Sequence, residues 1–200
     1  MKVIAAPSLL DRYLPDFQFR EVHTITVAAP PEQIFQAVME VTPGEIRLAG
    51  ALFWVRALPA RLAGRRVSPF AAHTPFLQQA ITPTGGFVLL AQSPREVVIG
   101  TVGQFWQVRG GSYPGLDDAQ GFADFADPAY AKAAIDFVIE PTQDGTSRLH
   151  TETRIVAGSR AARRRFAVYW WLIHPGSALL RRLWLGAIKH RAERSVPTSR

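Results

Sequence analysis

Residues 163–184, RRRFAVYWWLIHPGSALLRRLW, constrain the fold more than any other part of this sequence. A helical stripe of mostly apolar residues begins there, at Phe166, Trp170, Ile173, Ser177, Leu180, Trp184 and Ala187. Only fifteen residues lie between Arg165 and Arg181, whereas a helix needs about 20 to cross a bilayer. We therefore predict a long amphipathic helix, kinked at Pro175, whose apolar side covers the interior of the protein itself.

The composition is that of one globular domain. Of the 200 residues, 48% are hydrophobic and 20% are charged, and a chain of this length buries about 70% of its unfolded surface. We predict an N-terminal extension over residues 1–16, a single domain over 17–194 and a disordered tail over 195–200. The absence of cysteine excludes disulfides, thiolate ligands and a cysteine nucleophile. Because Pro7, Asp11 and Arg12 interrupt the N-terminal apolar stretch, we expect no signal peptide and a cytoplasmic location.

The net charge of +7 is concentrated near the C-terminus. Nine of the 23 Lys and Arg residues lie between residues 160 and 194, where Glu193 is the only acid. This face is either a solvated side of a helix or a surface for a partner. As a partner surface, it predicts transient contact with an anionic membrane through Arg181, Arg182 and Lys189. Nucleic acid is not expected as a partner, because the aromatic residues lie on the side that packs inward.

The remaining sequence alternates between strand and helix patterns. Residues 17–27 alternate with a period of two, and Pro30 and Pro31 then introduce a helix over 31–41. Shorter helices are expected between residues 42 and 83. Two β-hairpins, over 86–108 and 133–158, predict a meandering antiparallel sheet. The stretch 110–130 between them, rich in Gly and Asp, predicts a long loop or a short irregular edge strand.

One of these patterns resembles a known family. HTITVAAPPEQIFQAVMEV, residues 23–41, is a strand followed by APPEQIF and a helix, and it resembles the opening of the Bet v 1-like superfamily, also called START-like or SRPBCC. The resemblance covers about residues 17–193. It implies an α+β helix-grip fold, with a curved antiparallel sheet, short helices after the first strand and a long C-terminal helix over the sheet. Because the superfamily contains carriers, cyclases and ligand-sensing receptors, the resemblance does not imply one function. The region 42–83 is longer than in a minimal member, and the Asp-rich segment 117–127 is an addition.

With this fold, a cavity between the sheet and the last helix is the expected ligand site. Large aromatic side chains would border it: Phe105, Trp106, Tyr169, Trp170, Trp171 and Trp184. Each of them taken singly is also explained as packed core. Our predicted ligand-binding residues are His23, Phe105, Trp106, Glu152, Arg154, Tyr169 and Trp170.

Motifs for catalysis and metal binding are few. The sequence has no G-x-S-x-G, G-x-G-x-x-G, P-loop or H-E-x-x-H motif. The five histidines lack metal-ligand spacing, and the Asp residues of 117–127 do not match an EF-hand loop, so we expect no metal and no cofactor. Glu21 and His23 point to the same face of the first strand and suit a general base and its orienting partner. A strand end near solvent would explain the pair equally well.

Glu152 and Arg154 share one face of their strand, opposite Thr151, Thr153 and Ile155. If the threonine face points inward, the charged pair lies at the surface and contributes about 0–1 kcal/mol. If the charged face points inward, the pair forms a buried centre suited to a carboxylate or carbonyl ligand. Both arrangements stay open at this point.

Two functions remain compatible with the sequence. The first is the binding or carrying of a hydrophobic or amphipathic small molecule, lipid-like or polyketide-like. The alternative is a cofactor-free cyclase or dehydratase in which Glu21 and His23 enolise a polyketide-like substrate. No strong nucleophile or metal site is visible, so the sequence favours binding, and it leaves the oligomeric state open.

Overall fold

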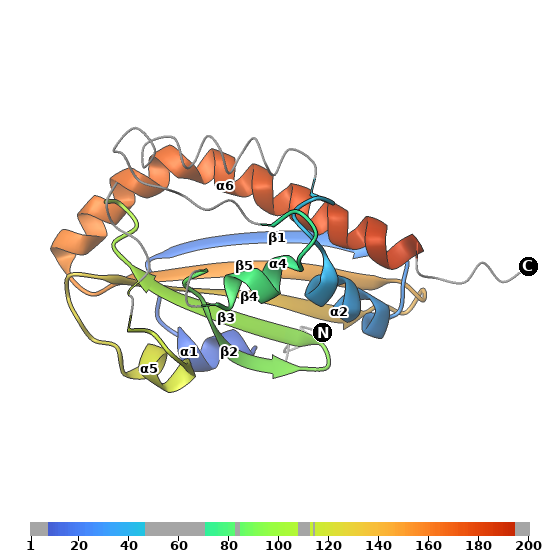
Figure 1. Ribbon diagram of the computed structural model, residues 1–200, viewed down its shortest axis with the longest axis horizontal. Helices are drawn as coiled ribbons and strands as arrows, with labels where there is room; N and C mark the ends of the chain where they lie inside the picture. Colours follow the sequence, from blue (N-terminus) through green and yellow to red (C-terminus); the bar gives the residue numbers. More distant parts are fainter. Residues whose placement is uncertain (1–7, 47–70, 83–84, 108–112, 114, 195–200) are drawn as a thin grey trace, which may run out of the picture.

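Five antiparallel strands form one sheet, and helices cover both of its faces (Figure 1). The computed structural model describes residues 8–46, 71–82, 85–107, 113 and 115–194. The strands are β1 (Phe19–Val27), β2 (Val88–Ser93), β3 (Glu96–Gly103), β4 (Ala131–Pro141) and β5 (Ser147–Ala157). The helices within these ranges are α1 (Leu9–Tyr13), α2 (Pro31–Glu40), α4 (Phe76–Ala80), α5 (Ala119–Asp124) and α6 (Arg160–Arg194). The predicted α+β class, with a long C-terminal helix over an antiparallel sheet, is confirmed.

The sheet joins the beginning of the chain to its later part. Its strand order is β1-β5-β4-β3-β2, so the two predicted hairpins, β2–β3 and β4–β5, are both formed. β1 pairs with β5 over its whole length, from Phe19 opposite Ile155 to Val27 opposite Ser147. β1 therefore forms one edge of the sheet, directly beside the strand that leads into α6.

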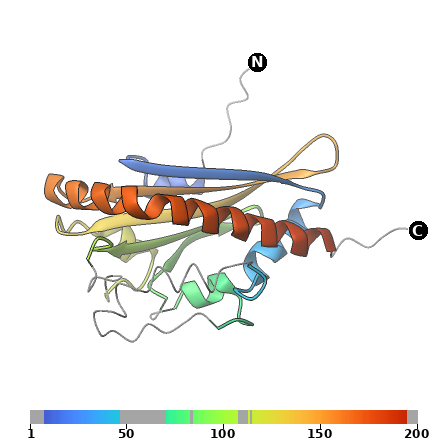
Figure 2. The same ribbon diagram turned by 90° about the horizontal axis from the view of Figure 1, so that it is seen from above.

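The helix α6 runs for 35 residues and continues through Pro175 without a break. Figure 1 shows it bowed, with its convex side away from the sheet, and Figure 2 shows it crossing the sheet lengthwise. A curve of this sense is usual for a long helix that covers a core. Ser159 caps its first turn by accepting a hydrogen bond from the Ala162 N–H at 3.2 Å.

The main apolar core lies between the sheet and α6, together with α2 and α4. We call this side of the sheet the α6 face. Trp184 packs edge-on against Phe76 of α4 and Phe137 of β4, with ring centroids 4.3 and 4.9 Å apart. Leu185 and Ile188 of α6 are almost completely buried in the same core. The C-terminal half of α6 is thus anchored by apolar packing.

The opposite side, which we call the α1 face, is covered by α1 and α5 and corrects two sequence predictions. Leu10 and Leu14 are buried there, so residues 8–14 belong to the packed domain and not to an extension. The predicted loop or edge strand between the hairpins contains the helix α5, which Asp118 caps by accepting from the Gly121 N–H. The sequence pattern did not predict this short helix, because Gly121 in its middle is typical of a loop.

Some predictions concern residues outside the described ranges. The helices expected between 42 and 83 are represented by α4 alone, since residues 47–70 lie outside these ranges, as does the predicted tail 195–200. Among the described helices, none is both long and apolar enough to cross a membrane.

The anchoring of α6 predicts a contrast between two of its residues. Ile188→Ala removes a side chain that is 0% exposed and should lower the free energy of unfolding by about 2–5 kcal/mol. Leu172→Ala removes one that is 72% exposed and should change it by less than about 0.5 kcal/mol. Urea unfolding followed by circular dichroism measures both changes. Equal effects would contradict this packing of the helix.

Candidate functional site

Glu21 and His23 interrupt the apolar α6 face of β1. Alternate residues of a strand point the same way, so they share this face with Phe19, Ile25 and Val27. His23 Nε2 lies 2.7 Å from Glu21 Oε1, and the two side chains are 13% and 4% exposed. With Glu21 ionised, Nε2 carries the shared hydrogen. The two residues are therefore in direct contact, between sheet and helix and not at a solvated strand end.

Two residues of α6 complete this group. Ser177 Oγ donates to Glu21 Oε2 at 3.3 Å, and one turn later Arg181 Nη2 donates to Thr153 Oγ1 at 3.0 Å. Thr153 lies directly opposite Glu21 in the β1–β5 ladder. We call Glu21, His23, Thr153, Ser177 and Arg181 the polar centre. It combines a carboxylate, an imidazole, two hydroxyls and a guanidinium in the interface between the sheet and α6.

Arg181 is a buried cation without an ion pair to any described residue. Burial lowers the pKa of its guanidinium to about 10, against the opposing influence of the Glu21 and Asp136 carboxylates. The group therefore stays protonated at neutral pH. Its partial compensation comes from the Thr153 hydroxyl and from the Trp184 ring, whose centroid lies 5.4 Å from Arg181 Cζ.

Three buried N–H groups on the α6 face have no acceptor among the described residues. One is Trp106 Nε1, whose ring contacts Phe166, and the other two are Arg181 Nη1 and Trp184 Nε1 of α6. A buried donor left unsatisfied costs about 1–3 kcal/mol, and buried polar groups are otherwise nearly always paired. The two residues are three apart in α6, so they lie on the same side of the helix. Oxygen atoms of a bound molecule would satisfy such donors.

An aromatic cluster adjoins the polar centre along the N-terminal half of α6. Its central ring is Phe166, which stacks with Trp170 at a centroid distance of 5.7 Å. The other rings that contact Phe166 are Phe19, Phe105, Trp106 and Tyr169. Four of the predicted ligand-binding residues, Phe105, Trp106, Tyr169 and Trp170, thus come together on the α6 face, as does His23.

The prediction for Trp171 was wrong. Its side chain is 81% exposed, whereas Trp170 is half-buried. Consecutive residues of a helix point about 100° apart, so Trp170 and Trp171 cannot both face the sheet. Trp171 belongs to the outer side of α6.

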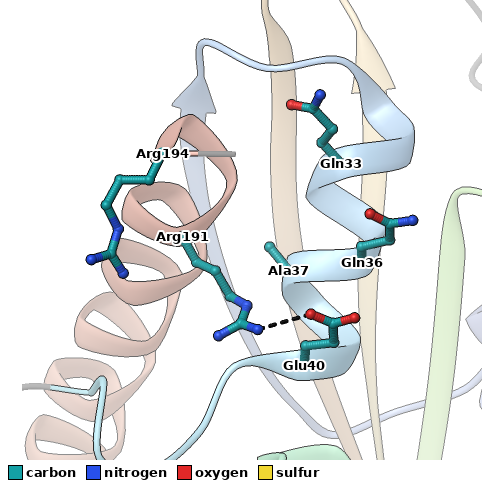
Figure 3. A pocket seen from close by; sticks show the side chains of 6 residues that line it. All are labelled: Gln33, Gln36, Ala37, Glu40, Arg191 and Arg194. Carbon is teal, nitrogen blue, oxygen red and sulfur yellow. Dashed lines mark hydrogen bonds and ion pairs between the residues drawn. The ribbon is translucent and has the colours of Figure 1, made fainter. Parts of the chain in front are cut away.

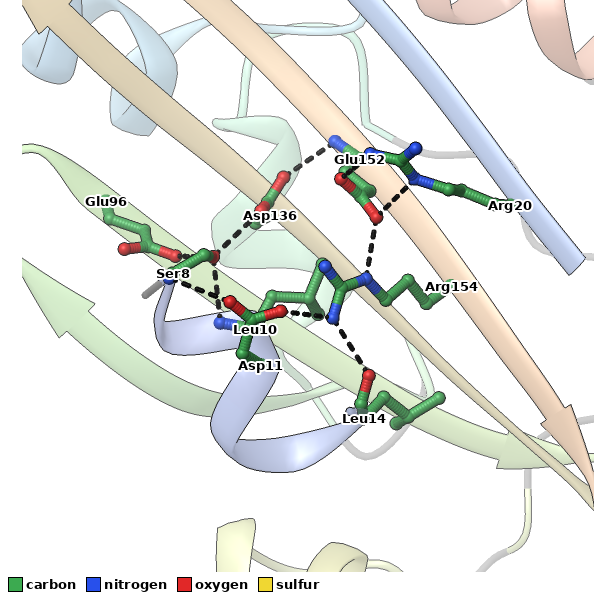
Figure 4. Close-up of polar contacts among 9 residues, drawn as sticks. All are labelled: Ser8, Leu10, Asp11, Leu14, Arg20, Glu96, Asp136, Glu152 and Arg154. Atoms are coloured by element: carbon green, nitrogen blue, oxygen red, sulfur yellow. Dashed lines mark hydrogen bonds and ion pairs between the residues drawn. The ribbon is translucent and has the colours of Figure 1, made fainter. Parts of the chain in front are cut away.

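Glu152 and Arg154 lie on the α1 face and cannot line a site under α6 (Figure 4). Arg20 contacts Glu152 through two nitrogen–oxygen pairs at 2.7 and 2.8 Å, and Arg154 Nε donates to Glu152 at 2.6 Å. Arg154 also donates to Asp11 of α1 and to the carbonyl of Leu14. Burial raises the pKa of Glu152, but hydrogen bonds from the two arginines outweigh it and lower the pKa below its usual value. Because Glu152 and Arg154 lie on the α1 face, the prediction that they bind a ligand under α6 was wrong. The pair is nevertheless buried, although the threonine face of β5 points to α6.

Asp136 lies beside this network, but its pKa is shifted in the opposite direction to that of Glu152. Burial raises the pKa of Asp136 to about 7, and the nearby Glu152 and Glu96 carboxylates reinforce this shift. The Glu152 N–H, which donates to Asp136 at 2.6 Å, opposes it. Ser8 Oγ, at the start of α1, donates to Glu96 at 2.6 Å and lies 3.4 Å from Asp136. This arrangement holds α1 against the sheet.

Other places in the described part of the chain do not suit a functional site as well. No group of His, Asp or Glu within the described ranges is placed to hold a metal ion. One surface pocket lies between α2 and the end of α6, where Arg191 donates to Glu40 at 2.8 Å (Figure 3). Arg191 also donates to Glu45 at 3.0 Å, so it links α6 both to α2, through Glu40, and to the turn that follows α2. Another pocket, near Pro128 and Arg165, contains no predicted site residue.

Sequence reasoning did not name Thr153, Ser177 or Arg181 as site residues, and the most consequential of the three is Arg181. Its position was predicted to be a charged flank of α6, because charged side chains are rarely buried without a partner. The signal that could have found it is the spacing of Ser177, Arg181 and Trp184, which follows the stripe at steps of four and three.

Comparisons with known proteins leave the family open. No family model and no curated protein matches the sequence. A crystal structure of a hypothetical protein from Helicobacter pylori is similar, with 10% identity, 96% of this chain and 99% of that chain covered, and a TM-score of 0.43. A similarity of this size assigns neither fold nor function.

The environment of Asp136 predicts how stability depends on pH. In the folded protein Asp136 keeps its proton up to about pH 7, whereas in the unfolded chain it loses it near its usual pKa of 3.8. Between these values rising pH therefore destabilises the fold through this group, by at most about 1.4 kcal/mol per pH unit. Asp136→Asn removes this contribution. Its stability relative to wild type, measured by urea unfolding, should rise with pH from about 4 to about 7 and then level off. A constant difference across this range would contradict the assignment.

Proposed function

We propose that the protein binds an amphipathic small molecule, lipid-like or polyketide-like, between the sheet and α6. The observation that carries this proposal is the pair of buried, unsatisfied N–H donors on Arg181 and Trp184. A carboxylate or a similar oxygen-rich anion would satisfy both and would neutralise the buried guanidinium. Arg suits this role because its nitrogens present a planar fork to two oxygens.

The neighbourhood supplies the second half of an amphipathic site. On the N-terminal side of the polar centre, Phe19, Phe166 and Trp170 form an apolar surface along β1 and α6. An anionic head at Arg181 would place an apolar tail against these rings. Apolar walls with a few converging polar groups are typical of small-molecule sites.

This proposal includes the finer fold assignment. The resemblance of residues 23–41 to the Bet v 1-like superfamily implied a helix-grip fold, and an antiparallel sheet covered lengthwise by its C-terminal helix supports it. The binding function rests on the polar centre and not on that assignment.

A pair of adjacent arginines allows a direct test. Arg181→Met should lower the affinity for a fluorescent long-chain fatty acid at least tenfold, because the buried cation is lost, while Arg182→Met removes an exposed charge and should retain binding. Wild type should bind the acid more tightly than the alcohol of equal chain length, and Arg181→Met should bind the two alike.

The ligand-free stability of Arg181→Met separates binding from folding. Replacing an unpaired buried charge by an apolar side chain should leave the free energy of unfolding unchanged or raise it. Urea unfolding checks this. Equal binding of acid and alcohol by wild type would refute an anionic head group at Arg181.

The contact between Glu21 and His23 favours a second candidate, a cofactor-free cyclase or dehydratase. Glu21 is a buried carboxylate held by His23 and Ser177, which suits a base that removes a proton next to a carbonyl group. The developing enolate would lie near the Arg181 cation.

This candidate predicts proton abstraction that depends on Glu21. Wild type should catalyse deuterium incorporation next to the carbonyl of a bound long-chain ketone, as followed by NMR, and Glu21→Gln should reduce the rate about 100-fold or more. Glu140→Gln, which changes a carboxylate at the far end of β4, is the matched control. If wild type shows no deuterium exchange above the rate in buffer, the enzyme candidate is refuted and only the binding function remains proposed.

A further inference from the structure

The outer side of α6 carries an apolar ridge that faces away from the sheet. Val168, Trp171, Leu172 and Leu179 are 72%, 81%, 72% and 44% exposed. Pro175, which is also exposed, lies between them. Their spacing of three and four places them on one side of the helix, and at 1.5 Å per residue the ridge extends about 16 Å. A continuous exposed patch of this kind marks an interaction surface.

Arginines bracket this ridge on the same side of α6. Arg164 and Arg165 precede it and Arg182 follows it, and all three are exposed. Their side chains make no ion pair with the described part of the protein. Residues 160–188 contain six arginines and no Asp or Glu. Within this stretch of α6, the charges next to the ridge are therefore all positive.

The structure leaves only part of the membrane-contact surface that the sequence predicted, which was Arg181, Arg182 and Lys189. Arg181 is buried in the polar centre. Lys189 donates to the carbonyl of Thr26 at 2.7 Å and pairs with Glu193 at 2.8 Å. Of the three predicted cations, Arg182 alone is exposed without an ion pair to a described residue.

We propose that the ridge docks the protein on an anionic lipid surface. Trp171, Leu172 and Val168 would enter the boundary between head groups and acyl chains, where amphipathic helices with a cationic border bind. Arg164, Arg165 and Arg182 would contact lipid phosphates. The docked helix lies in the plane of the surface and does not span it.

Charge complementarity favours lipid over the other occupants of such a ridge. A two-fold contact between two copies would place the same arginines against each other, with no acid in the ridge to pair them. Nucleic acid would use the arginines and the exposed ring of Trp171, contrary to the expectation that the aromatic residues all face inward, but Val168, Leu172 and Leu179 have no polar group that its phosphates could bind. An anionic membrane uses both the charges and the apolar side chains.

Vesicle co-sedimentation tests the proposal with the full chain. Wild type should bind vesicles of equal parts phosphatidylcholine and phosphatidylserine, should bind phosphatidylcholine alone much less, and should be released by salt. Arg164→Gln with Arg182→Gln should lower partitioning to the anionic vesicles about 30-fold, which is about 2 kcal/mol. Arg12→Gln with Arg95→Gln removes equal charge from two exposed sites outside α6 and should have little effect.

The apolar side chains need a separate variant. Trp171→Ser with Leu172→Ser should reduce anionic partitioning about tenfold while circular dichroism and thermal unfolding stay unchanged. Retained binding in this variant would overturn the proposal, as would equal binding to both vesicle types. If wild type is a dimer and this variant is a monomer, the ridge binds a second copy of the chain and the proposal fails. Tighter binding to DNA than to anionic vesicles would overturn the proposal in favour of nucleic acid. Arg181→Met should dock like wild type, so docking and ligand binding fail independently.

Discussion

The pairing of β1 with β5 is the constraint from which the rest of the structure follows. It brings residues 19–27 beside residues 147–155, more than a hundred positions later in the chain. On the α6 face this places Glu21 opposite Thr153, to which Arg181 donates. On the α1 face it places Arg20 within reach of Glu152. One ladder thus creates both the candidate site and the network that holds α1.

The local elements followed from sequence patterns, because each pattern is short-range. Period-two alternation predicted β1, and the Pro30–Pro31 pair predicted the start of α2. Turn residues between β-rich runs predicted both hairpins. The helix α5 was missed, because six residues with a central glycine lack the periodicity that identifies longer helices. α1 was missed as part of the domain, because its burial depends on a sheet surface built from later residues.

The site was predictable only in part, for a related reason. Strand periodicity placed Glu21 and His23 on one face, and their contact follows from that geometry. Which face of β5 was covered could not be deduced, because both faces are covered: by α6 on one side and by α1 on the other. The position of Arg181 depended on the rotation of α6 over the sheet, and packing set that rotation, not charge.

A buried guanidinium lies on each side of β5, and the two differ in how many acceptors they have. Arg154 has carboxylates of Glu152 and Asp11 and a backbone carbonyl as acceptors, so its burial is compensated within the protein. Arg181 has one hydroxyl acceptor and an unsatisfied nitrogen within the described structure, although Glu21 lies on the facing strand. His23 and Ser177 already occupy the two oxygens of that carboxylate. Within the described structure the chain thus pairs one buried arginine fully and leaves the other short of acceptors. The first supports the fold, and the proposed ligand would complete the second.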